Sequence, residues 1–186
     1  MWNDRPAAST NLYSPGASPV SRFLWEFMKQ VLTLSLSDVS YLAGLIDGEG
    51  TVTLSRRHKN RQPELAISIS STERQLLEFA LRSTGVGKIT NKKRYKAHHL
   101  PSYVYGVTNQ QALKVLRQIA PHLLSYKRKR ADLILSKYTQ LTPRNGKYSR
   151  DLLTQREAFV RAVLAIKAIP GDYFLVEEPR ALYIAA

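Results

Sequence analysis

The residues Tyr41–Thr51, YLAGLIDGEGT, combine an apolar helical stretch with two carboxylates at its end. Asp47 and Glu49 alternate with Gly48 and Gly50, so both acids stand where the helical pattern stops. Carboxylate oxygens are preferred ligands of hard divalent cations such as Mg²⁺. Glycines let the backbone leave a helix without a Cβ clash. The stretch therefore indicates acid delivered at a helix end, a pattern suited to cation-dependent chemistry.

Positive charge is concentrated in one part of the chain. The sequence has 28 Lys or Arg against 14 Asp or Glu, a formal net charge of +14 and a pI of about 10.1. Residues 51–131 hold 17 Lys or Arg and only three acids, Glu64, Glu73 and Glu78. Such clustering indicates a polyanionic partner, and nucleic acid is favoured over an anionic membrane surface.

Composition excludes several classes of protein. The chain has no Cys, which rules out disulfides and Cys-ligated zinc and fits a reducing compartment. No apolar run approaches the roughly 20 residues that span a bilayer, and no charged start followed by an apolar segment marks a secretory signal. We therefore expect an intracellular, non-secreted protein without a membrane partner, in an organelle or in the cytoplasm of an archaeon or bacterium.

The helix that carries the acids is predicted from its apolar spacing. Ser37 is predicted to cap it, and Val39, Leu42, Leu45 and Ile46 recur on one face. This face requires a partner to cover it, and the residues that follow supply a sheet.

The remaining elements are predicted to form matching units. Residues 51–70 alternate at period two around a basic turn and predict two strands. Thr72–Gln75 has capping-box spacing and opens a helix that Gly85 ends. A second strand pair and further helices follow: Asn109 is predicted to cap one helix, and the other two start at about Lys127 and at Leu152. The order predicts an α+β domain in which helices back one face of an antiparallel sheet.

One folded domain is predicted over residues 35–170. Residues 1–34 begin with a stretch rich in Pro, Ser, Ala and Gly and are interpreted as a flexible or surface-hugging N-terminal extension. Residues 171–186 form an apolar C-terminal tail.

Leu42–Gly50, LAGLIDGEG, resembles the signature of the LAGLIDADG homing endonucleases, with Glu49 in an acid position and Gly48 where the family name has Ala. The resemblance extends over residues 37–140 and includes the order of elements. It implies an αββαββα core whose sheet forms a saddle for a duplex. It also implies a divalent-metal-dependent, site-specific endonuclease that cuts both DNA strands and is intron-encoded.

The same resemblance implies positions for the catalytic machinery. Glu49 falls at the metal-ligand position, with Gly48 beside it, and the implied cofactor is Mg²⁺ or Mn²⁺. Lys127 falls where relatives carry a Lys near the scissile phosphate, where it would stabilise charge or order the attacking water. Ser71, where relatives carry Gln or another polar residue, and Arg74 are further catalytic candidates. For Ser71 a helix-capping role is the alternative.

The single motif implies a homodimer on a long, near-palindromic target, because cutting both strands requires two active sites. Small residues in the motif would let two copies of the helix approach closely. Asp47 is also implied to hold the helix end through backbone hydrogen bonds. The predicted interface residues are Leu42, Ala43, Gly44, Ile46 and Asp47.

Sequence specificity is expected from the strand face opposite the apolar one. A two-stranded ribbon fits the major groove, where Arg reads guanine and Gln reads adenine. Basic residues after Lys127 are expected to clamp phosphates. The DNA-binding candidates are Ser55, Arg57, Lys59, Arg61, Gln62, Glu64, Ser68, Thr90, Lys92, Arg94, Tyr103, Tyr105, Arg128 and Lys129.

Other functions remain open on the sequence alone. Proteins of this family also act as RNA maturases, which bind an intron and assist its splicing, and an intact Glu49 favours cleavage over that role. A transcription factor on the same fold would carry a helix-turn-helix after the core, whereas residues 150–169 predict one helix. An unspecific basic DNA-binding protein would show a steep salt dependence and no sequence preference.

Overall fold

The structure, a computed structural model, describes residues 30–57, 59, 61–93, 100–143 and 146–168. The predicted N-terminal extension up to residue 29, Arg94 and the tail over residues 171–186 lie outside these ranges. Within the described ranges, no helix has the length and apolar character needed to cross a membrane.

The motif lies on helix α2, Leu36–Glu49, and the last residue of that helix is the second acid. The cap is Ser35 rather than the predicted Ser37, because the Ser35 hydroxyl accepts from the Asp38 amide at 3.2 Å. At the other end the Gly50 amide donates to the Ile46 carbonyl. A Cβ at Gly50 would lie 2.6 Å from the Cα of Ile46, so this close return of the chain requires glycine.

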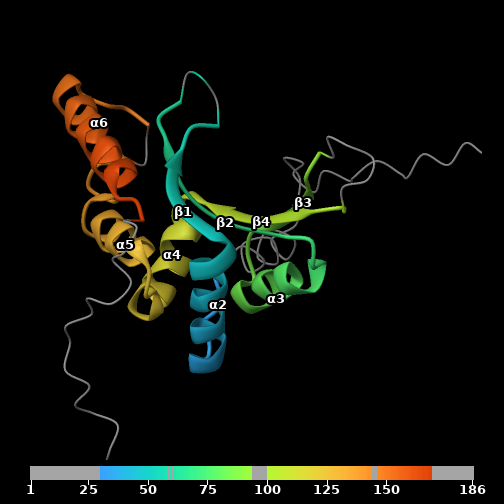
Figure 1. The fold of residues 1–186 in the computed structure, drawn as a ribbon. Coiled ribbons are helices and arrows are strands. Elements are labelled where there is room, and N and C mark those ends of the chain that lie inside the picture. The colour runs from blue at the N-terminus through green and yellow to red at the C-terminus, as the bar shows by residue number, and fades with distance from the viewer. Residues whose placement is uncertain (1–29, 58, 60, 94–99, 144–145, 169–186) are drawn as a thin grey trace, which may run out of the picture.

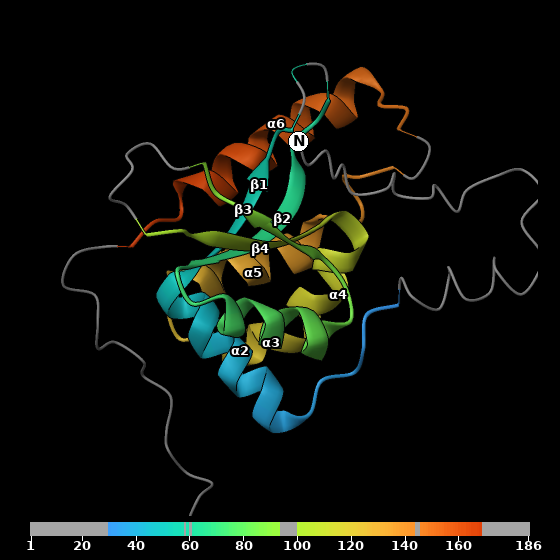
Figure 2. The same cartoon turned by 90° about the vertical axis from the view of Figure 1, so that its right-hand side faces the viewer.

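Four strands form one antiparallel sheet in the order β1-β2-β4-β3. Helices α2, α3 and α4 cover one face of this sheet, and α6 lies beside β1 (Figures 1 and 2). The predicted α+β fold and order of elements are thus confirmed. The strands are β1 Gly50–Ser55, β2 Glu64–Ser71, β3 Lys88–Asn91 and β4 Tyr103–Thr108. The later helices are α3 Arg74–Thr84, α4 Asn109–Ile119, α5 Tyr126–Lys137 and α6 Arg150–Ala165, with a 3₁₀ turn at Ala120–His122.

Alternation along the strands separates a buried face from an open one. Partners in an antiparallel pair share a face, and the register pairs Val52 with Ile67 and Leu54 with Leu65 on the side that the helices cover. The opposite side of the sheet carries mostly short polar side chains and no helix (Figure 1). By register this open face consists of Thr51, Thr53, Ser55, Glu64, Ala66, Ser68, Ser70, Lys88, Thr90, Val104, Gly106 and Thr108.

The predicted orientation of Tyr103 and Tyr105 is wrong. The register pairs Tyr105 with Ile69 and places both tyrosines on the helix-covered face. Tyr105 is 1% exposed, and its hydroxyl contacts the Thr84 hydroxyl at 2.9 Å and donates to the Val86 carbonyl at 3.0 Å. In YVYGVT both alternating sets lack charged residues, so the pattern of β4 alone could not decide which set faces outward.

Three predicted helix starts differ from those observed. Helix α3 begins after Glu73 without a side-chain cap, and the Ser71 hydroxyl accepts from the Glu73 amide at 3.0 Å in place of the expected Thr72 box. Helix α4 is preceded by Thr108, and Asn109 is its first residue with φ of 57°. Helix α6 starts at residue 150, because the Ser149 hydroxyl accepts from the Leu152 amide at 3.2 Å.

Tyr105→Phe is expected to lower the free energy of unfolding by about 1 kcal/mol, because it removes the hydrogen bonds that the buried hydroxyl makes with Thr84 and Val86. Tyr103→Phe is the control, since this ring is only half-buried on the same strand, and it is expected to change stability by less than about 0.5 kcal/mol. Urea unfolding measures both. Equal effects would contradict the assignment of the buried hydroxyl.

Candidate active site at the end of helix α2

Glu49 is the last residue of α2, and its side chain is exposed. Within the described ranges no hydrogen bond or ion pair engages its carboxylate. Beside it, Gly48 lies in the last turn of the helix, where no following turn supplies an amide to its carbonyl. These oxygens fit a hard divalent cation. One carboxylate is an incomplete ligand set, and the described part of the chain holds no group of three acids or histidines suited to a metal.

Asp47 has a structural role, as predicted. Its carboxylate accepts from the Leu124 amide at 2.7 Å, from the Ser125 amide at 3.4 Å and from the Ser125 hydroxyl at 2.5 Å. Ser125 is itself the N-cap of α5 and accepts from the Lys127 amide at 3.2 Å. The first acid of the motif therefore joins the end of α2 to the start of α5.

Lys127 is buried and contacts the same helix end. Its Nζ donates to the Ile46 and Asp47 carbonyls, both at 2.8 Å, and the residue is 6% exposed. Burial lowers the pKa of this ammonium, an effect opposed by the nearby charge of Asp47. A cation at the carbonyl end of a helix is favoured by the helix dipole. Lys127 thus holds the turn that carries Glu49, and this contact is the role that the structure gives it.

The other catalytic candidates have local partners. Ser71 serves the turn before α3, which is the capping alternative. Arg74 pairs with Glu78 at 2.8 Å and lies 5.7 Å from the centre of the Tyr103 ring. Neither residue is brought to Glu49 by a contact in the described part of the chain.

The candidates for phosphate clamping lie on α5, away from the open face. Arg128 pairs with Asp132 at 3.0 Å and donates to the Pro121 carbonyl at 3.0 Å. Lys129 is exposed on the same helix. Because α5 packs beneath β1 on the helix side (Figure 1), these cations do not line the open face.

The predicted outward orientation is confirmed for Ser55, Glu64, Ser68 and Thr90. Lys92 follows β3, and its amide donates to the Ser102 carbonyl at 2.8 Å. In the connection between β1 and β2, Lys59 and Arg61 are exposed and Gln62 is half-buried. Arg57 folds over the open face, where Nε lies 2.8 Å from the Glu64 carboxylate and Nη2 donates to the Thr108 hydroxyl at 3.0 Å.

One segment of the chain holds the acid-bearing end of α2, the four strands beside it and the family signature. A family described as LAGLIDADG endonuclease matches residues 42–142, more than half of the 186-residue chain. The chain belongs to the LAGLIDADG endonuclease family. It is accordingly a DNA endonuclease. No curated protein matches the sequence.

Solved homing endonucleases share the fold of this LAGLIDADG endonuclease. I-CvuI in complex with its target matches with a TM-score of 0.58 at 17% identity, over 72% of this chain and 85% of that chain. I-CvuI with the I-CreI target and Mg matches with a TM-score of 0.57 at 19% identity, again over 72% of this chain and 85% of that chain. The meganuclease I-SmaMI bound to DNA gives 0.54 at 16% identity, over 79% of this chain and 52% of that chain.

Three residues predicted for the dimer interface of the endonuclease lie inside the protomer. Leu42, Ala43 and Ile46 are each 0% exposed, because this face of α2 packs on the sheet and α4. Asp47 is half-buried against α5. Only Gly44, with no atom within 4 Å of the Cβ position, keeps the predicted accessibility. The prediction took the buried face of the helix for its exposed one.

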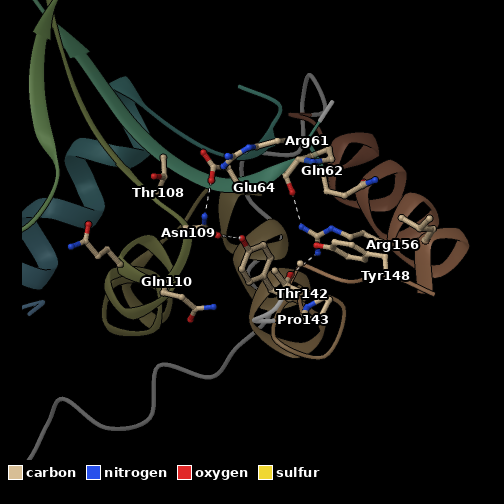
Figure 3. A pocket seen from close by; sticks show the side chains of 15 residues that line it. Arg61, Gln62, Glu64, Thr108, Asn109, Gln110, Thr142, Pro143, Tyr148 and Arg156 are labelled. Carbon is tan, nitrogen blue, oxygen red and sulfur yellow. Dashed lines mark hydrogen bonds between the residues drawn. The ribbon is translucent and has the colours of Figure 1, made fainter. Parts of the chain in front are cut away.

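A hollow of about 980 Å³ lies at the far end of the β1–β2 ladder from Glu49 (Figure 3). Arg156, 1% exposed, crosses its base and donates to the Pro63 and Leu141 carbonyls at 2.6 and 2.9 Å. Arg156 therefore anchors α6 to the end of the sheet, and Glu49 does not line this hollow. The sequence predicted neither the bond of Arg156 to Pro63 nor the contact of Asn109 with Glu64, since neither residue belongs to a motif.

Lys127→Met is expected to destabilise the fold by about 2 kcal/mol, because two carbonyls at the end of α2 lose a charged donor. Lys129→Met removes an exposed cation from the same helix and is expected to cost less than about 0.5 kcal/mol. The midpoint of urea unfolding separates the two variants. An unchanged midpoint for Lys127→Met would show that the buried contact is not formed in solution.

Proposed function

We propose that this endonuclease acts as a homodimer that cuts both strands of a long, near-palindromic duplex, with a divalent cation, Mg²⁺ or Mn²⁺, at Glu49. The observation that carries the proposal is the single accessible carboxylate at the end of α2. One protomer offers one acid, so a second copy completes the ligand set. We also propose, on the family resemblance, that the gene lies within an intron.

The exposed face of α2 is suited to meet a second copy. Gly44 and Gly48 have no atom within 4 Å of their Cβ positions. On the same helix Leu36 and Tyr41 are 72% and 49% exposed. Small residues permit close helix packing, and exposed apolar side chains gain by being covered. Two such helices in contact bring the two copies of Glu49 together.

The proposed chemistry divides between the cation and the chain. A divalent cation bound by carboxylates activates water and stabilises the leaving oxygen of a phosphodiester. Glu49 and the carbonyl of Gly48 provide oxygen ligands. Lys127 and Asp47 keep the end of the helix in place through their bonds to the backbone.

The open face of the sheet is the proposed DNA surface. It carries hydroxyls and Lys88, Arg57 folds over it to reach Glu64 and Thr108, and no described helix covers it (Figures 1 and 2). The net charge of +14 favours a polyanion. I-CvuI, which shares the fold, is described in complex with its DNA target.

Glu49→Gln is expected to reduce cutting by more than about a hundredfold and to leave duplex affinity nearly unchanged, because it removes a metal-binding charge without altering shape. Cleavage of a randomised duplex library in Mg²⁺ and in EDTA, read by sequencing the ends, measures this. Glu73→Gln, an exposed acid elsewhere, is the control. Undiminished cutting by Glu49→Gln would refute the role of this acid. Duplex binding by the unaltered protein without any cut would favour the RNA maturase.

Gly44→Leu is expected to convert the dimer into a monomer, because the protomer has room for the side chain but two facing helices do not. The control is Ala162→Leu, which places a leucine at an exposed position on α6. Light scattering across a concentration series gives the mass. A Gly44→Leu protein that stays dimeric would place the interface on another face.

A further inference from the structure

Glu64 is the only acid on the four strands of the sheet. It lies on the open face, where it pairs across the ladder with Ser55. A carboxylate there repels the phosphates of a duplex unless its charge is compensated. Its presence on the surface proposed to contact DNA therefore requires an explanation other than phosphate binding.

Both oxygens of Glu64 are occupied. Oε1 lies 2.8 Å from Nε of Arg57, and Oε2 accepts from Nδ2 of Asn109 at 2.7 Å. Asn109 in turn accepts from the Tyr138 hydroxyl at 2.8 Å, and that hydroxyl accepts from the Leu65 amide at 3.1 Å. Figure 3 shows the Glu64 and Asn109 side chains pointing toward one another. A chain of one ion pair followed by three hydrogen bonds thus links an exposed guanidinium to the core.

The inner members of this chain are fixed in place. Tyr138 is 0% exposed. Asn109 has φ of 57°, and no other non-glycine residue in the described ranges has a positive φ. Asn is among the few residues that tolerate this conformation. Its amide then bridges the Tyr138 hydroxyl and the Glu64 carboxylate.

The arrangement orders Arg57 more than it stabilises the fold. The side chains of Arg57 and Glu64 are 51% and 22% exposed, and pairs in such surroundings contribute little to stability. A guanidinium has five N–H donors. The contacts to Glu64 and Thr108 use one on Nε and one on Nη2. Within the described residues three donors are left, two on Nη1 and one on Nη2, and a bidentate contact with O6 and N7 of guanine needs two of them.

We propose that Glu64, Asn109 and Tyr138 are positioning residues that hold Arg57 to read one guanine in each half of the target. Arg57 makes the base contact, and Glu64 orients it without touching DNA. The proposal rests on the proposed function, because it requires the open face to bind a duplex.

A binding selection without added Mg²⁺ tests this independently of cutting. The full-length protein and its variants are each incubated with a randomised duplex library, and the retained duplexes are sequenced. The unaltered protein is expected to enrich guanine at one position in each half-site. Arg57→Ala and Glu64→Ala are both expected to lose that enrichment by at least about tenfold, at the same position. Lys59→Ala, the control, removes an exposed cation and is expected to weaken binding without changing the base pattern.

Tyr138→Phe separates positioning from direct contact. Tyr138 is fully buried and cannot touch a duplex, so a weakened guanine preference at the Arg57 position must be transmitted through its hydrogen-bond partners, Asn109 and the Leu65 amide next to Glu64. A thermal melt confirms that the variant is folded at the selection temperature. If Glu64→Ala keeps the guanine preference, or Tyr138→Phe changes only other positions, the positioning proposal is wrong and site-specific binding stands. If the unaltered protein enriches no sequence, both proposals fail.

Discussion

The attachment of the C-terminal end of α2 to the start of α5 is the constraint on which the candidate site depends. Asp47 receives donors from Leu124 and Ser125, while Lys127 donates to carbonyls of the α2 terminus in the opposite sense. These reciprocal bonds join residues about 80 positions apart and close over a buried ammonium. A buried charge is tolerated only when paired and hydrogen-bonded. The position of Glu49 is consequently set by contacts that Glu49 does not make.

Much of the fold could be predicted from the sequence because two periods are clear in it. The apolar positions of α2 recur at helical spacing, and Leu65, Ile67 and Ile69 alternate with polar neighbours, so helix, strands and the open face of β2 follow. The outward face of β4 could not be predicted, since Tyr103, Val104, Tyr105 and Val107 are all apolar or aromatic and only pairing with β2 fixes their direction. The error about α2 has a different source: its interface residues were taken from the family resemblance, although helical spacing already placed Leu42 and Ile46 on the face that the sheet covers.

The basic run Lys127–Arg130 contributes less positive charge to the protein surface than its composition implies. Of the run Lys127–Arg130, Lys127 binds helix carbonyls, Arg128 pairs with Asp132, and Arg130 donates to the Val52 and Ile166 carbonyls. Only Lys129 in this run is exposed. The sequence does not distinguish these four cations, because the backbone carbonyls that bind Lys127 and Arg130 lie far from them along the chain. Net charge indicates the class of partner, and the fold decides where that partner meets the protein.

Because Leu42, Ala43 and Ile46 are buried within one chain, each protomer completes its hydrophobic core by itself. Association of two protomers through the other side of α2 would then join two chains that are already folded, and it would not be a step of folding. Two differently altered copies could be mixed after purification and form hybrid pairs. In the proposed dimer each protomer would recognise its own half of the target, and a hybrid pair would therefore recognise an asymmetric one.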